Sequence, residues 1–113
     1  MRSRTQPISQ VDIENEISRL MEALEDETEM FERICEDAAR KEAEFKREWA
    51  KSYLSAKGPV KERESWATWQ VAEYHEAMTI SEGLMRAKRE RLTSLRTMLD
   101  SLRTLAANVR NLT

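Results

Sequence analysis

A single step, Gly58-Pro59, is the only place in this chain where a glycine and a proline stand together. Glycine readily forms the left-handed cap that ends a helix, and proline suits the first turn of the next helix. The 113 residues contain only two glycines and two prolines, so other turn signals are scarce. The sequence therefore predicts an all-α chain with a helix over about 10–57, a turn near 58–59 and a second helix over about 60–110.

Both helical stretches carry an apolar stripe. In the first, apolar residues recur three, four or seven positions apart from Ile13 to Trp49, and Ser9 precedes the stripe as a helix N-cap. The stripe loses an apolar residue near 27–28 and again near 41–42, but no glycine or proline interrupts residues 27–42. The second ends in an alternation of three and four that is typical of a coiled coil. The expected oligomer interface consists of Leu95, Met98, Leu102, Leu105, Val109 and Leu112. The same spacing also suits packing inside the chain, or docking of a different protein.

Charge is unevenly distributed along the chain. Residues 12–37 contain eleven acidic and two basic residues, whereas residues 86–110 contain seven basic and two acidic ones. An antiparallel hairpin that turns at Gly58 places residue i near residue 117 − i, so these opposite charges meet. Two helices alone form a thin core. We therefore expect a long antiparallel helical hairpin with coiled-coil-like packing, forming one domain over 9–113 after a flexible arm over 1–8 and assembling into a homo-oligomer.

Few residues suit catalysis or metal binding. His75 is the only histidine and Cys35 the only cysteine, and the hairpin register separates them by about two helical turns. There is no Gly-rich phosphate loop, so we expect no enzyme activity, no metal and no cofactor. A lone cysteine suits a reducing compartment, and no apolar run approaches the roughly 20 residues that span a bilayer. We expect a cytoplasmic protein, in the host cytoplasm if it is phage-encoded, with no membrane contact and no signal peptide.

All three tryptophans lie between residues 49 and 69, interleaved with cations around the turn. A positive track combined with aromatic faces is what binds single-stranded nucleic acid. The candidate nucleic-acid-binding residues are Lys46, Arg47, Lys51, Tyr53, Lys57, Lys61, Arg63, Trp66 and Trp69. Packing at the end of the hairpin or in an oligomer interface is the alternative for all three tryptophans, and it is favoured most for Trp49, which lies on the apolar stripe.

Three stretches resemble small helical proteins encoded in phage early regions, near single-strand annealing or recombination functions: AEFKREWAK (43–51), GPVKERE (58–64) and RLTSLRTML (91–99). The layout of a lysine-rich first helix, a Gly-containing turn and a long second helix with a leucine tail is similar to the UvsY-type phage recombination mediator family. The resemblance covers roughly 35–110 and implies an oligomer that binds single-stranded DNA and helps to load a recombinase. It implies that the positively charged region contains Lys46, Arg47, Lys51, Lys57, Lys61 and Arg63.

From these features we expect an oligomeric accessory protein of phage type that binds single-stranded DNA through the turn and assists recombination or replication. Its expected partners are further copies of itself, single-stranded DNA, and a recombinase, annealing protein or other host or phage protein. The alternative is an adaptor or inhibitor that acts through its helical faces without binding nucleic acid, because the acidic 12–37 segment suits a basic partner. A structural coiled-coil component of a particle is a third interpretation.

Overall fold

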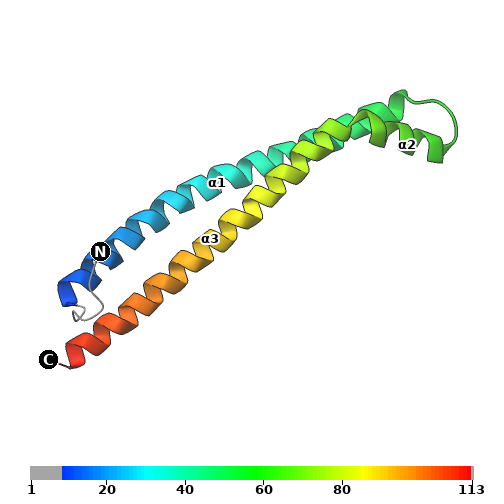
Figure 1. Ribbon diagram of the computed structural model, residues 1–113. Helices are drawn as coiled ribbons and strands as arrows, with labels where there is room; N and C mark the ends of the chain where they lie inside the picture. The colour runs from blue at the N-terminus through cyan, green and yellow to red at the C-terminus, as the bar shows by residue number, and fades with distance from the viewer. Residues whose placement is uncertain (1–8, 113) are drawn as a thin grey trace. The chain divides into compact units, whose positions relative to one another are not determined.

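The computed structural model describes residues 9–112 and places them in three α-helices, with no strand among these residues (Figure 1). Helix α1 spans Gln10–Ser55, α2 spans Val60–Gln70 and α3 spans Ala72–Asn111. The expected all-α fold is thus confirmed for this part of the chain. The expected arm over 1–8 lies outside the described residues. In the described range, no helix is long and apolar enough to cross a membrane.

Helix α1 begins at a reciprocal cap. The Ser9 hydroxyl oxygen accepts a hydrogen bond from the Asp12 backbone N–H at 3.1 Å, and the same hydroxyl donates to the Asp12 carboxylate at 2.7 Å. The first bond satisfies a helix-end donor that has no partner within the helix, and the Asp12 carboxylate lies at the favourable end of the helix dipole. The helix then continues through residues 27–42, where the sequence predicted no interruption.

The turn between α1 and α2 is centred on Gly58. Its φ of +106° lies in a region that side chains with a Cβ rarely adopt. Pro59 follows in an extended conformation, and its carbonyl oxygen accepts the Arg63 backbone N–H at 3.0 Å. The break therefore lies where the Gly-Pro step predicted it, and α1 ends slightly before the expected position at 57.

Where the sequence predicted one helix over 60–110, the structure has two, divided at Val71. This residue has φ −106° and ψ 18°, outside the helical range, although its N–H donates to Ala67 O at 3.1 Å and its carbonyl accepts from His75 N at 3.0 Å. Val71 is only 2% exposed, so packing holds its β-branched side chain in place. Apolar periodicity reports which face is buried and is insensitive to the dihedral angles of one residue, so it did not predict this division.

The chain forms two compact units. The described residues of the first unit are 9–29 and 89–112, and its core consists of the buried Leu20, Leu95 and Leu99, surrounded by the half-buried Ile17, Ala23, Leu24 and Leu102. Arg91 lies 3.7 Å from the Glu27 carboxylate. Because Leu20 meets Leu95 whereas the later Glu27 meets the earlier Arg91, α1 and α3 are antiparallel in this unit.

Residues 30–88 form the second unit, in which α1 again packs against an antiparallel partner. The Ser81 hydroxyl donates to the Asp37 carboxylate at 3.3 Å, and the Trp49 indole N–H donates to the Thr68 hydroxyl at 3.4 Å. The second pair matches the 117 − i register, and the first differs from it by one residue. Ala67 is fully buried, and a side chain this small lets helices approach closely.

The residues expected to form the oligomer interface differ in how deeply they are buried in the first unit. Leu95 is buried in the core and Leu102 packs against it, Leu105 and Val109 are half-buried, and Met98 and Leu112 are exposed. The buried stripe of α3 instead consists of Leu92, Leu95, Leu99 and Ala106. Assembly through Met98 and Leu112 stays a prediction.

Candidate nucleic-acid interface at the turn

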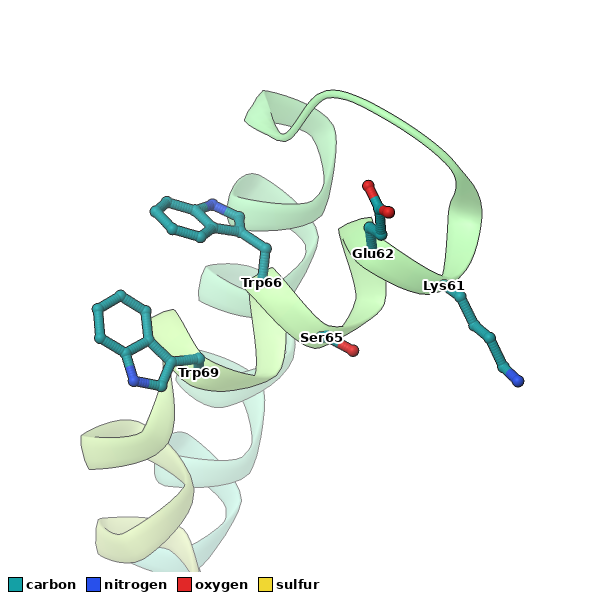
Figure 2. Close-up of a pocket in the computed structure, with 5 residues that line it drawn as sticks. All are labelled: Lys61, Glu62, Ser65, Trp66 and Trp69. Carbon is teal, nitrogen blue, oxygen red and sulfur yellow. The ribbon is translucent and has the colours of Figure 1, made fainter.

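Two of the three tryptophans are exposed on α2. Trp66 is 46% exposed and Trp69 is 70% exposed. Their ring centroids lie 5.7 Å apart with the planes tilted by 39°. Residues three positions apart share one side of a helix, and Figure 2 shows both rings projecting from the same side of α2. Large aromatic rings are normally well buried, so this exposed pair is the most distinctive feature of the turn region.

A shallow hollow accompanies the two rings. It is lined by Lys61, Glu62, Ser65, Trp66 and Trp69. In Figure 2 the Lys61 side chain extends away from the rings. Glu62 and Ser65 were not among the candidates chosen from the sequence, although helical spacing places Glu62 one turn before Trp66. We call Lys57, Lys61, Trp66 and Trp69 the tip surface.

Trp49 packs against its neighbours within the second unit. It is half-buried, stacks on Tyr53 with centroids 5.3 Å apart and planes 11° from parallel, and donates its indole hydrogen bond to Thr68. The contact with Thr68 joins α1 to α2. The packing alternative therefore describes Trp49, which does not belong to the tip surface.

Arg63 and Tyr53, both candidates for nucleic-acid binding, are occupied within the fold. The Arg63 guanidinium lies over the Tyr53 ring, 4.5 Å from its centroid, and donates a 3.3 Å hydrogen bond to the Tyr53 carbonyl oxygen. Tyr53 thus contacts Trp49 through its ring and Arg63 through both ring and backbone. A cation–π contact and a charge-assisted hydrogen bond together hold α2 against the end of α1.

The remaining candidate cations are exposed, and two of them form local ion pairs. Lys46 lies 2.9 Å from Glu42, and Lys51 lies 3.3 Å from Glu48. Both pairs join residues within one turn of α1, and such surface pairs contribute little stability. Exchanging either carboxylate for another anion would therefore cost little free energy. Arg47, Lys57 and Lys61 are also exposed.

His75 and Cys35 lie in the same unit as the turn. The His75 ring contacts Phe45 edge-on, with centroids 5.3 Å apart, and Cys35 is a half-buried free thiol. Across residues 9–112, no group of three or more His, Cys, Asp or Glu side chains is arranged to hold a metal ion. His75 is exposed, so this edge-on contact with Phe45 lies at the surface of the unit.

The tip surface therefore offers two accessible indole faces and two lysines on long, flexible stems. This combination suits a ligand that presents flat rings and negative charge together. No protein-family model, no curated protein and no solved structure matches the chain.

Proposed function

We propose that this chain is an oligomeric helical accessory protein of phage type that binds single-stranded DNA at the tip surface and assists recombination or replication. The observation that supports it most is the exposure of Trp66 and Trp69 on one side of α2. The resemblance to the UvsY-type mediators supports the recombination role. That role includes contact with a recombinase or annealing protein.

Stacking is the first interaction in this proposal. A base that stacks on an aromatic ring contributes about 1 to 3 kcal/mol, and it does so with little regard to sequence. Trp66 and Trp69 both leave much of their ring surface open to solvent. Lys57 and Lys61 supply the second interaction, because their ammonium groups sit on flexible stems that follow phosphates. In a nucleotide the phosphate lies beside the base and away from its stacking face. Lys57 and Lys61 can therefore contact phosphates without pointing at the tryptophan rings.

The anchoring of α2 favours binding energetically. Arg63, Tyr53 and Trp49 hold α2 in one position before any ligand arrives. A surface that is already ordered loses less conformational entropy on binding. In an oligomer, several tip surfaces contact one strand, and this multivalency raises the overall affinity of individually weak sites.

Fluorescence anisotropy of a labelled oligo-dT tests the stacking interaction. We expect Trp69→Ala to weaken binding by about 5-fold to 150-fold, which corresponds to the loss of one stacked base. Leu54→Ala is the matched control, because Leu54 is 75% exposed at the end of α1 and carries no ring. Equal affinities for the two variants would contradict stacking at Trp69.

The salt dependence of the same titration tests the cations. For single strands the slope of log K against log salt changes by about 0.7 for each phosphate contact. Lys57→Gln with Lys61→Gln should flatten the slope accordingly and leave the helical content unchanged. Arg63 is unsuitable for this test because it anchors α2. An unchanged slope would exclude the two lysines from the interface.

A protein adaptor is the second candidate function. Glu62 lines the hollow beside the rings, and α1 exposes the carboxylates of Glu22, Glu25, Asp26 and Glu29. A basic, apolar protein surface suits these groups better than a phosphate backbone does. The adaptor interpretation predicts no binding of oligo-dT even at low salt, which distinguishes it from the first proposal.

A further inference from the structure

Helix α3 carries a second apolar seam beside its buried residues, within the unit formed by residues 30–88. Ile80 is 64% exposed and Leu84 is 48% exposed. With Ala77 and Ala87 they repeat at intervals of three, four and three, the spacing by which one helix packs along another. We call Ala77, Ile80, Leu84 and Ala87 the outward seam. Ser81, one turn after Ala77 and one turn before Leu84, is buried and donates a hydrogen bond to Asp37 of α1, so the outward seam borders the side of α3 that packs against α1.

Gly83 lies beside this seam in the middle of α3. Glycine inside a helix costs about 1 kcal/mol relative to alanine. A Cβ atom built at this position would meet only the Arg86 Nη2 atom, at an ordinary contact distance of 3.9 Å. Packing within the chain therefore does not require glycine here. A helix crossing from outside at this point would come unusually close, because helix separation depends on the side chains at the contact.

The charges at the two ends of the outward seam differ in sign. Glu73 and Glu76 precede it and are exposed, whereas Arg86 and Lys88 lie at its far end. A second α3 in parallel orientation would place like charges side by side. An antiparallel α3 places each acidic end beside a basic end. A second copy thus supplies both the apolar seam and the complementary charges.

We propose that the outward seam binds the outward seam of a second copy, with the two α3 helices antiparallel and their two-fold axis passing near Gly83. In this register Ile80 of each copy faces Leu84 of the other, and Ala77 faces Ala87. Such layers match the seam positions that meet in antiparallel coiled coils. The inference goes beyond the proposed function, because it uses no residue of the tip surface.

The expected affinity follows from the size of the contact. The outward seams of two copies, each with four apolar side chains of which two are alanines, give a contact of a few hundred Å2, below the roughly 1,200 to 2,000 Å2 of stable complexes. The dimer should therefore dissociate in about the micromolar range or above, and dimerisation should depend visibly on concentration.

Disulfide trapping tests the orientation. In the full chain with Cys35→Ser, Ala77→Cys and Ala87→Cys are prepared separately, one of them labelled with 15N so that mass spectrometry identifies each linked pair. Oxidation of the mixture should give several-fold more linked dimer than either variant alone, and the linked species should contain one copy of each. Equal linkage in the separate variants would indicate parallel helices and overturn the proposal. So would the absence of any excess in the mixture.

Sedimentation equilibrium tests the surface itself. Leu84→Lys should weaken dimerisation at least 10-fold, while Leu54→Lys, another exposed leucine in the same unit, should leave it unchanged. Gly83→Leu should also weaken the dimer, while circular dichroism shows helical content equal to or above that of the unmodified chain. A chain that stays monomeric up to millimolar concentration, or one whose assembly is indifferent to Leu84→Lys, would overturn the proposal.

Discussion

Substituting two adjacent residues of α3, one at a time, tests which side of this helix packs against α1. Leu99 is 4% exposed and belongs to the core with Leu20 and Leu95, whereas Met98 is 47% exposed. Leu99→Ala should destabilise the chain strongly, and Met98→Ala should do so only weakly. The two substitutions lie in the same helix and remove side chains of similar size, so each is the control for the other.

The structure sets the magnitude of the difference. Leucine-to-alanine substitutions in cores cost about 2 to 5 kcal/mol, and the cost is smaller where neighbours collapse into the space. The core around Leu99 has only two other buried leucines, and its remaining members are half-buried. We therefore expect a loss of about 2 to 3 kcal/mol for Leu99→Ala. For Met98→Ala, whose side chain is already half in water, we expect less than about 1 kcal/mol.

Urea denaturation followed by circular dichroism measures both values, at several protein concentrations so that assembly is controlled. The corresponding drop in Tm for Leu99→Ala is roughly 10 °C, since each kcal/mol shifts a domain of this size by about 4 °C. If Met98→Ala were the more destabilising change, Met98 would face α1 and the arrangement of the first unit would be wrong. If Met98→Ala changed only the concentration dependence, Met98 would lie in an oligomer interface.

Three further predictions concern the helix ends and a surface pair. Ser9→Ala should lower the stability of the chain by about 1 kcal/mol and fray the start of α1. Amide hydrogen exchange over the first turn measures the fraying, and an unaltered exchange rate would show that Ser9 does not cap the helix. Gly58→Ala should cost about 1 kcal/mol or more in thermal unfolding because φ is +106°, and no loss of Tm would mean the turn relaxes freely. The hydrogen bond from Arg19 lowers the pKa of Glu16, so the stability from this pair is present above the unfolded-state pKa and is lost as pH falls through the lower folded-state value. NMR titration should show the Glu16 pKa returning toward its ordinary value in Arg19→Gln, and an identical midpoint in both proteins would count against the pair.

Much of the fold was predictable because its signals are local. Gly58-Pro59 placed the turn, and Ser9 followed by Asp12 placed the start of α1. The buried stripe of α3 was harder to identify. From Leu95, both the step of three to Met98 and the step of four to Leu99 fit a heptad, and only contact with α1 decides between them. The division at Val71 depends on one residue's dihedral angles, which leave no trace in apolar spacing.

The tip surface was predictable in part. The sequence placed tryptophans and cations near the turn, and Trp66 and Trp69 are exposed there. The 117 − i register places residue 53 near residue 64, but it does not show which way the neighbouring Arg63 side chain turns, so the contact of Arg63 with the Tyr53 ring was not predicted. Trp49 was easier to predict: it stacks on Tyr53 at helical spacing, and its hydrogen bond to Thr68 of α2 joins two residues that the 117 − i register places together.

A tryptophan fluorescence titration with oligo-dT reports directly on whether single-stranded DNA binds at the tip surface. In the Trp49→Phe variant, which keeps an aromatic ring on Tyr53, all tryptophan emission comes from the two rings of the tip surface. Binding of single-stranded DNA at the tip surface should give saturable quenching at low salt that weakens as salt is raised. An emission spectrum unchanged by oligo-dT at low salt would contradict the claim that single-stranded DNA binds at Trp66 and Trp69.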